Sequence, residues 1–230
     1  MQFDPIHPEI LTPRRHLVAA TPLRRNLDIF SGRATSLADD VETAMAAVPG
    51  DQPRDNLFAL ALLAHTTATI PGHIVDIGAG QGRTAAVLGH AAKATGRSRV
   101  FAVDLFPESE DAPDDVACSL DSLLASMTVH GLLEWVLPHY GTGGTFAQLM
   151  PEDFRCRVLL LEGAHACSDM ATDIFALERF LAPGGWLAID QAFSSFPGAT
   201  LALETLFRQR SHFEMAHHLT PSLYIARKQS

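Results

Sequence analysis

Five short apolar segments alternate with helical segments between residues 73 and 190, and this alternation constrains the fold more than any other feature of the sequence. The segments expected to form strands are 73–77, 99–103, 133–138, 157–162 and 186–190. Helices are expected between them at 82–93 and 114–127, and at 170–181, where the apolar spacing is helical and a Pro-Gly-Gly breaker follows. Strands that alternate with helices predict an α/β fold with a doubly wound parallel sheet.

The chain ends in two further expected strands, 212–218 and 222–227, which follow an expected helix at 199–208. Only a short turn around Thr220 and Pro221 separates these two strands. Because a parallel crossover needs about a dozen residues or more, the two strands must pair antiparallel. The sequence therefore predicts a parallel α/β sheet that is completed by an antiparallel hairpin.

Residues 1–70 follow a different pattern, which predicts an N-terminal helical extension of the domain at 71–230. Residues 1–35 show no period and contain four prolines, so we expect either a solvated arm or a lid or dimer arm over a site. Ser36 and Asp39 resemble a capping box at the start of a first helix. A second helix, apolar nearly all round, is expected at 53–67, and it is compatible with a homodimer.

Charge and composition argue against several classes of function. The chain has 230 residues and a formal net charge of −9, which disfavours nucleic acid and anionic membranes as partners, because both require a basic surface. No apolar run reaches the roughly 18 residues of a membrane span, and the N-terminus lacks a signal-peptide pattern. The three cysteines form no CxxC motif, so we expect reduced thiols and a cytoplasmic protein.

The most informative motif is VDIGAGQGRT at 75–84, between the first expected strand and its helix. Its glycines let the backbone turn sharply and let a ligand approach closely. Their GxGxG spacing differs from the GxGxxG of dinucleotide sites, and Asp76 would repel a pyrophosphate but could pair with a cationic amine. Asp104 ends the second strand 22 residues after Gly82, where an acid suits ribose hydroxyls. The pattern favours a nucleoside-type ligand over a glycine turn that binds nothing.

These motifs resemble those of the class I S-adenosylmethionine-dependent methyltransferases over residues 73–227. VDIGAGQG resembles the first motif of that family, AVDLF its acidic ribose motif, and FLAPGGWLAID its entry into the fifth strand. The resemblance implies a Rossmann-like seven-stranded sheet in the order 3-2-1-4-5-7-6, with strand 7 antiparallel. It also implies that S-adenosylmethionine is bound by Asp76, Gly78, Ala79, Gly80, Gly82, Thr84, Asp104, Leu105, Gly141 and Thr142.

Within that site, the resemblance implies particular contacts for some of these residues. The three glycines would surround the methionine part of the donor, Asp104 would hold the ribose, and Thr84 would contact the methionine carboxylate. The sequence departs from the family after the third strand. YGTG at 140–143 stands where the family often carries a Gly-Asp-Ser that touches the adenine.

A second group of polar residues follows the fourth and fifth expected strands. Glu162 and His165 follow the fourth strand, and Asp190 and Gln191 follow the fifth. Because the carboxyl ends of adjacent parallel strands lie side by side, two carboxylates, an amide oxygen and an imidazole can converge beside the donor. Such oxygen ligands suit Mg²⁺ or Ca²⁺, which would acidify a hydroxyl acceptor. The imidazole could then take the proton.

These residues resemble the methyltransferase family 24 and the macrocin-type sugar and natural-product O-methyltransferases, whose fourth strand ends in DGxH and whose fifth ends in two acids. The resemblance implies that Glu162, Asp190 and Gln191 hold Mg²⁺, and that His165 is the general base, with Glu162 as its catalytic neighbour. Glu162 is one methylene longer than the family's aspartate, and Gln191 is neutral. A helix cap, a structural hydrogen bond and a polar contact to the donor remain alternative roles for these side chains.

The sequence thus predicts an S-adenosylmethionine-dependent methyltransferase that methylates a hydroxyl of a small natural-product or sugar-like molecule, with or without Mg²⁺. The alternative is a protein of the same fold that binds the adenosyl ligand without catalysis, as a regulatory or scaffold subunit. A nicotinamide-dependent oxidoreductase is disfavoured by Asp76 and by the glycine spacing. The motifs name neither the acceptor nor the oligomeric state.

Overall fold

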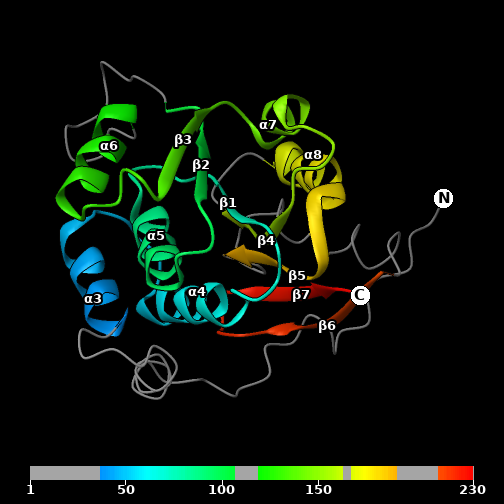
Figure 1. Ribbon diagram of the computed structural model, residues 1–230, viewed down its shortest axis with the longest axis horizontal. Helices are drawn as coiled ribbons and strands as arrows, with labels where there is room; N and C mark the ends of the chain where they lie inside the picture. The colour runs from blue at the N-terminus through cyan, green and yellow to red at the C-terminus, as the bar shows by residue number, and fades with distance from the viewer. Residues whose placement is uncertain (1–36, 107–118, 163–166, 191–211, 230) are drawn as a thin grey trace.

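The computed structural model describes residues 37–106, 119–162, 167–190 and 212–229. Seven strands in these ranges form one sheet in the order β3-β2-β1-β4-β5-β7-β6 (Figure 1). The strands are β1 (His73–Ile77), β2 (Val100–Asp104), β3 (Val136–Tyr140), β4 (Cys156–Glu162), β5 (Leu181–Asp190), β6 (Phe213–His218) and β7 (Tyr224–Lys228). The predicted fold class and strand order are confirmed.

Parallel pairing runs through the first five strands and ends at the hairpin. β1 pairs in parallel with β2 and β4, β2 with β3, and β4 with β5. β7 is antiparallel to both β5 and β6, which confirms the predicted hairpin. The carboxyl ends of β1 to β5 therefore lie along one edge of the sheet, which is where ligands bind in folds of this kind.

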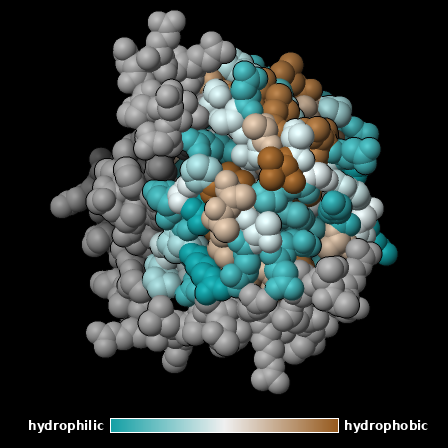
Figure 2. All heavy atoms as spheres, turned by 90° about the vertical axis from the view of Figure 1, so that its left-hand side faces the viewer, coloured by the Kyte–Doolittle hydropathy of each residue, from teal (hydrophilic) through white to brown (hydrophobic). Residues whose placement is uncertain are grey.

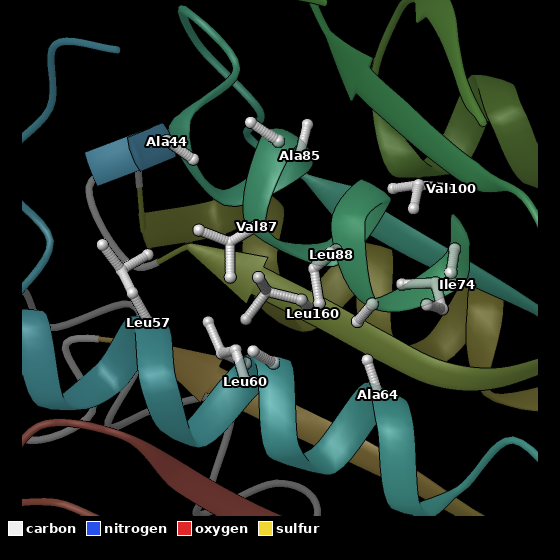
Figure 3. Packing of buried hydrophobic residues seen from close by; sticks show 14 of the residues in the cluster. Ala44, Leu57, Leu60, Ala64, Ile74, Ala85, Val87, Leu88, Val100 and Leu160 are labelled. Atoms are coloured by element: carbon white, nitrogen blue, oxygen red, sulfur yellow. The ribbon is translucent and has the colours of Figure 1, made fainter. Parts of the chain in front are cut away.

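Helices cover both faces of the sheet. The described helices are α3 (Leu37–Ala47), α4 (Arg54–Thr66), α5 (Arg83–Thr95), α6 (Leu120–Val129), α7 (Gly143–Leu149) and α8 (Cys167–Leu177), with a 3-10 helix η1 at Glu178–Phe180. One buried apolar cluster joins α3, α4, α5 and α6 to one face, and a second joins α7, α8 and η1 to the other. In Figure 3, Leu57 and Leu60 of α4 face Val87 of α5 and Leu160 of β4. The two described helices of the N-terminal region thus share the main core.

Side-chain alternation along the strands decides which face the acidic residues join. Near their carboxyl ends, β1, β4 and β5 each carry one acid: Asp76, Glu162 and Asp190. The residues two positions before these acids belong to the apolar cluster beneath α4 and α5: Ile74, Leu160 and Ala188. Because strand residues two apart point to the same face, all three acids project toward the α4 and α5 side of the sheet.

Several boundaries differ from the sequence-based prediction. The helix expected to reach 181 ends at Leu177, η1 follows, and β5 begins at Leu181 instead of 186. The Pro-Gly-Gly segment lies within the strand as an irregularity of β5. Gly184 takes a φ of 77°, and the stretch from Leu181 to Trp186 faces only Cys156 to Val158 on β4. α6 begins at Leu120, after an extended Ser119 N-cap, instead of at 114. α7 was not expected at all, while Ser36 and the helix predicted at 199–208 lie outside the described residues.

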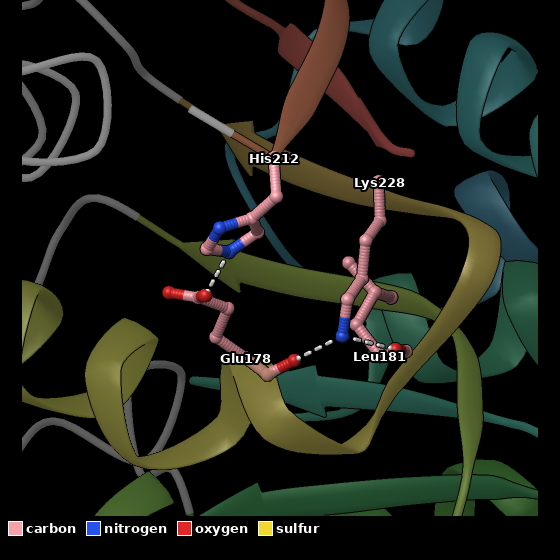
Figure 4. Close-up of polar contacts among 4 residues, drawn as sticks. All are labelled: Glu178, Leu181, His212 and Lys228. Atoms are coloured by element: carbon pink, nitrogen blue, oxygen red, sulfur yellow. Dashed lines mark hydrogen bonds and ion pairs between the residues drawn. The ribbon is translucent and has the colours of Figure 1, made fainter. Parts of the chain in front are cut away.

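Polar contacts tie the last strands to η1 at the end of the sheet opposite the site (Figure 4). Lys228 Nζ donates to the backbone oxygens of Glu178 at 3.1 Å and of Leu181 at 2.7 Å. The Glu178 carboxylate forms a hydrogen bond with the His212 imidazole, at the start of the hairpin. These contacts hold the first and last residues of the hairpin against η1 and the start of β5.

The described surface is mixed in character. Figure 2 shows a largely hydrophilic face on which apolar side chains gather in one region. The exposed large hydrophobic residues include three on and around the edge strand β3: Leu133, Leu137 and Tyr140. Pro138 lies in the middle of β3, where it offers no N–H to a further strand. Among the described helices, none combines the length and apolar character that crossing a bilayer requires.

Candidate functional site

A glycine-rich loop joins β1 to α5 at the carboxyl edge of the sheet. Gly80 and Gly82 have φ angles of 51° and 92°, a left-handed backbone that other residues rarely adopt. A Cβ at Gly82 would lie only 3.1 Å from a side chain of α6. The N–H groups of Gly78 and Ala79 donate to Val103 O at 2.9 and 3.3 Å, which fixes the loop to β2. Backbone conformation and close packing together explain why this loop needs glycine.

Asp104, at the end of β2, is held against that loop by backbone donors. Gly80 N–H donates to Asp104 Oδ2 and Phe106 N–H donates to Asp104 Oδ1, both at 2.9 Å. Phe106 adopts a positive φ of 41°, which is uncommon for a bulky residue. Two backbone N–H groups therefore orient the buried Asp104 carboxylate next to the glycine loop. Each of its oxygens can still accept a second hydrogen bond, such as one from a ribose hydroxyl.

Two exposed side chains border Asp104. Leu105 follows Asp104 in the sequence and is 53% exposed. Tyr140 is the register partner of Asp104 on β3 and is 72% exposed. Gly141 donates its N–H to Asp104 O at 2.9 Å. The Thr142 side chain is the N-cap of α7 and accepts from Thr145 N–H, so its oxygen is already engaged. Tyr140 was noted in the sequence only as the first residue of YGTG, without a role of its own.

Asp76 and Thr84 form a buried pair beneath the loop. Both side chains are fully buried, and Thr84 Oγ1 donates to Asp76 Oδ2 at 2.8 Å. Burial, opposed by the Thr84 bond and reinforced by the charges of Asp104 and Asp190, raises the pKa of Asp76 to about 7. The threonine hydroxyl that the resemblance assigned to the donor's carboxylate thus points at Asp76.

Glu162 and Asp190 lie side by side at the ends of β4 and β5, as predicted. They are direct register partners in a parallel pair, and both are buried. Burial, and then the charges of Asp76 and Asp190, raise the pKa of Glu162 well above its usual value. Glu162 Oε1 is buried and has no hydrogen-bond partner within the described ranges. Two buried carboxylates so placed favour a shared proton or a bound cation.

Two amide side chains from the N-terminal region reach these carboxylates. Gln52 Nε2, in the loop between α3 and α4, donates to Glu162 Oε2 at 2.7 Å. Asn56 Nδ2, in the first turn of α4, donates to Asp190 Oδ1 at 2.5 Å. No sequence pattern predicted a role for either residue. For Asn56 the available signal was a polar residue directly before the apolar run of α4, Leu57–Ala64.

Asn56 also connects Asp190 to the turn of the terminal hairpin. Its Nδ2 donates to Ser222 Oγ at 2.9 Å, and its Oδ1 accepts a hydrogen bond from Thr220 Oγ1. Thr220 Oγ1 in turn accepts from Leu223 N–H at 3.0 Å. One chain of buried polar contacts therefore links α4, the end of β5 and the hairpin turn.

The described residues fit part of the predicted metal site. Glu162 and Asp190 supply two adjacent carboxylates, and the buried Glu162 Oε1 is available as a ligand. Mg²⁺ is commonly held by one or two carboxylates together with waters and substrate. No group of three or more His, Cys, Asp or Glu in the described ranges is arranged to hold a metal. The predicted base His165 and the third predicted ligand Gln191 lie outside those ranges.

Comparison with known proteins identifies the family. Residues 75–192, just over half of the chain, match the family model described as Methyltransferase domain. This match begins in β1, and it includes the glycine loop, Asp104 and the acids of β4 and β5. No curated protein sequence matches the chain.

Solved methyltransferase structures share the fold. The O-methyltransferase NovP has a TM-score of 0.67 at 15% identity, over 92% of this chain and 100% of that chain. CalS11, a TDP-rhamnose 3'-O-methyltransferase of calicheamicin biosynthesis, has a TM-score of 0.60 at 14% identity, over 94% and 99%. A methyltransferase from Geobacter sulfurreducens has a TM-score of 0.54 at 17% identity, over 84% and 87%. With the sequence match and the strand order, the chain belongs to the Methyltransferase domain family, within the class I S-adenosylmethionine-dependent methyltransferases.

Proposed function

We propose that this protein transfers a methyl group from S-adenosylmethionine to a hydroxyl oxygen of a small natural-product or sugar-like molecule. One observation carries the proposal. The glycine loop with its fixed Asp104 lies at the same sheet edge as the buried Glu162 and Asp190 pair. The first is suited to an adenosyl ligand and the second to a polar acceptor. The O-methyltransferase activity that NovP and CalS11 carry in their descriptions supports this choice.

The residues have separate tasks in this reaction. When bound, S-adenosylmethionine supplies a methyl group on a positively charged sulfur, and its transfer breaks the C–S bond as the acceptor oxygen forms the new C–O bond. Asp104 and the loop glycines hold the nucleoside and methionine parts so that the methyl group faces the carboxylate pair. His165 takes the proton that the acceptor hydroxyl loses. The protein therefore contributes mainly alignment and proton removal.

A divalent cation fits the acceptor side of this proposal. Glu162 and Asp190, with Gln191, would hold Mg²⁺, which would orient and acidify the acceptor hydroxyl. The side-chain amides of Gln52 and Asn56 each donate a hydrogen bond to one of the two carboxylates. All three proposed ligands would bind the cation through oxygen atoms, which agrees with the preference of Mg²⁺ for oxygen ligands.

Calorimetric titration of metal-stripped protein with S-adenosylhomocysteine, repeated with Mg²⁺, tests the proposal. We expect micromolar binding of the nucleoside product, and a separate heat from Mg²⁺ that is lost in Glu162→Ala. Absence of nucleoside binding under both conditions would contradict the methyltransferase proposal. Tight binding without methyl transfer to any alcohol, phenol or sugar in a panel would instead support the non-catalytic, ligand-binding alternative.

A further inference from the structure

The contact between Gln52 and Glu162 joins the N-terminal region to the acceptor side of the site. We propose that Gln52 is a positioning residue, which holds one oxygen of Glu162 so that the other is presented to a divalent cation. This inference rests on the proposed function. It assigns part of the cation site to the loop between α3 and α4, outside residues 75–192 that match the family.

The hydrogen bond is selective between the two carboxylate oxygens. Gln52 Nε2 donates to Glu162 Oε2 at 2.7 Å, and Glu162 Oε1 is buried without a hydrogen-bond partner in the part of the chain that the structure describes. A buried carboxylate oxygen without a donor is costly unless a proton or a cation meets it. Engaging Oε2 therefore leaves Oε1 as the oxygen that a cation would find.

The loop that carries Gln52 is held in place by α5, the helix that follows the glycine loop. Arg83, the first residue of α5, donates a hydrogen bond from its guanidinium to Gly50 O. Gly50 is packed so closely that a Cβ there would lie 2.7 Å from both Gln52 Oε1 and Arg83 Cδ. The backbone that precedes Gln52 is thus held by the helix that begins at the glycine loop, and Gln52 Oε1 packs against Gly50. Gln52 is therefore not a freely rotating surface side chain.

The length of the Glu162 side chain explains why a hydrogen bond from Gln52 is useful. Glutamate has one more rotatable bond than the aspartate expected at this place, so more rotamers must be excluded before its carboxylate is aligned. Asn56 holds Asp190 through a comparable amide contact, at 2.5 Å. Each carboxylate of the pair is therefore oriented by a side-chain amide from the start of α4 or from the loop before it. Because an amide is neutral, it adds no charge to the pair.

Gln52→Met tests the inference, because methionine has a similar length but no N–H donor. Gln148→Met is the matched control, since Gln148 is exposed on α7. The probe is Mn²⁺, with the free ion measured by electron paramagnetic resonance in the presence of S-adenosylhomocysteine. Loss of a residue that orients a metal ligand typically weakens metal affinity by about 10–100-fold. We expect that loss in Gln52→Met, with S-adenosylhomocysteine affinity within about twofold of wild type and no change in the control.

A second variant shows whether the loss follows from the missing donor. Gln52→Leu removes the same N–H group without adding a charge or a metal-binding oxygen, so Mn²⁺ affinity should fall as far as in Gln52→Met if that group matters. Equal Mn²⁺ affinity in wild type and Gln52→Met would overturn the inference, as would a wild-type protein that binds S-adenosylhomocysteine but no Mn²⁺. Failure of the proposed function is distinguishable, because it appears as absent S-adenosylhomocysteine binding in metal-free wild type.

Discussion

Asp76 is a buried carboxyl group whose ionisation opposes folding. Its pKa rises from 3.8 to about 7 in the folded protein, mainly through burial. The folded state therefore holds the proton at pH values where the unfolded state has lost it. Stability from this group is fully present below pH 3.8 and is lost as the pH rises through about 7.

Asp76→Asn should remove this loss, because the amide does not ionise and its oxygen can still accept from Thr84. The ligand-free variant should be more stable than wild type above pH 7, by an amount on the order of a few kcal/mol that shrinks toward pH 4. Urea unfolding at a series of pH values measures the difference. Parallel stability curves for the two proteins across this range would contradict the prediction.

His165 is the residue to which the proposed function assigns proton removal. His165→Ala should lower kcat by about 10²–10⁴-fold if proton transfer limits the reaction. S-adenosylhomocysteine affinity should stay near the wild-type value, since the donor site is built from other strands. A variant with full activity would remove His165 from the mechanism.

At the scale of elements, α4 is attached to the sheet at both ends. Its first turn reaches Asp190 through Asn56. Near its last turn, Arg157 of β4 donates from Nη2 to Ala64 O at 3.1 Å and from Nη1 to Gly72 O at 3.0 Å. The Arg157 side chain is fully buried, and burial lowers its pKa to about 10. A buried cation thus satisfies one carbonyl in the last turn of α4, Ala64 O, and one in the segment that leads into β1, Gly72 O.

Arg157→Met should destabilise the protein, because the packing volume is kept while two buried carbonyl oxygens lose a charged donor. We expect the free energy of unfolding to fall by about 2–4 kcal/mol, from the usual worth of hydrogen bonds to charged groups. Chemical denaturation measures the change. Arg155→Met is the control on the same strand region, since Arg155 is exposed, and it should change stability by less than about 0.5 kcal/mol. Equal losses in the two variants would show that the buried contacts contribute little.

At the scale of the whole molecule, the N-terminal helices and the methyltransferase sheet form one packed body in the described residues. α3 and α4 contribute to the same apolar cluster as α5 and the central strands. The polar chain from Gln52 and Asn56 to the acids runs alongside this cluster and continues into the hairpin turn. Residues 37–66 therefore contact the candidate site directly. The lid or dimer arm expected of residues 1–35 lies outside the described residues and stays a prediction, as does the homodimer.

The sequence alone carried enough information for the sheet and for the place of the proposed donor site. Strand periodicity, the short final turn and the glycine spacing are local features, and local backbone preferences act within a few residues. Gly80 and Gly82 need their left-handed backbone wherever the loop is placed. Asp104 and the acids of β4 and β5 were predictable too, because parallel strands bring their carboxyl ends to one edge.

Tertiary structure decided the contacts that no local pattern encodes. Gln52 meets Glu162 across 110 positions of sequence, and Asn56 meets Asp190 across 134. Local rules also failed at 181–185, where a Pro-Gly-Gly segment is part of β5, between Leu181 and Trp186, which both pair with β4. In each case the deciding energy comes from partners that are distant in sequence, since burial and hydrogen bonding depend on what the folded chain brings together. The motif residues of the candidate site could therefore be placed at one sheet edge from the sequence, whereas the side chains that contact them became visible only in the folded chain.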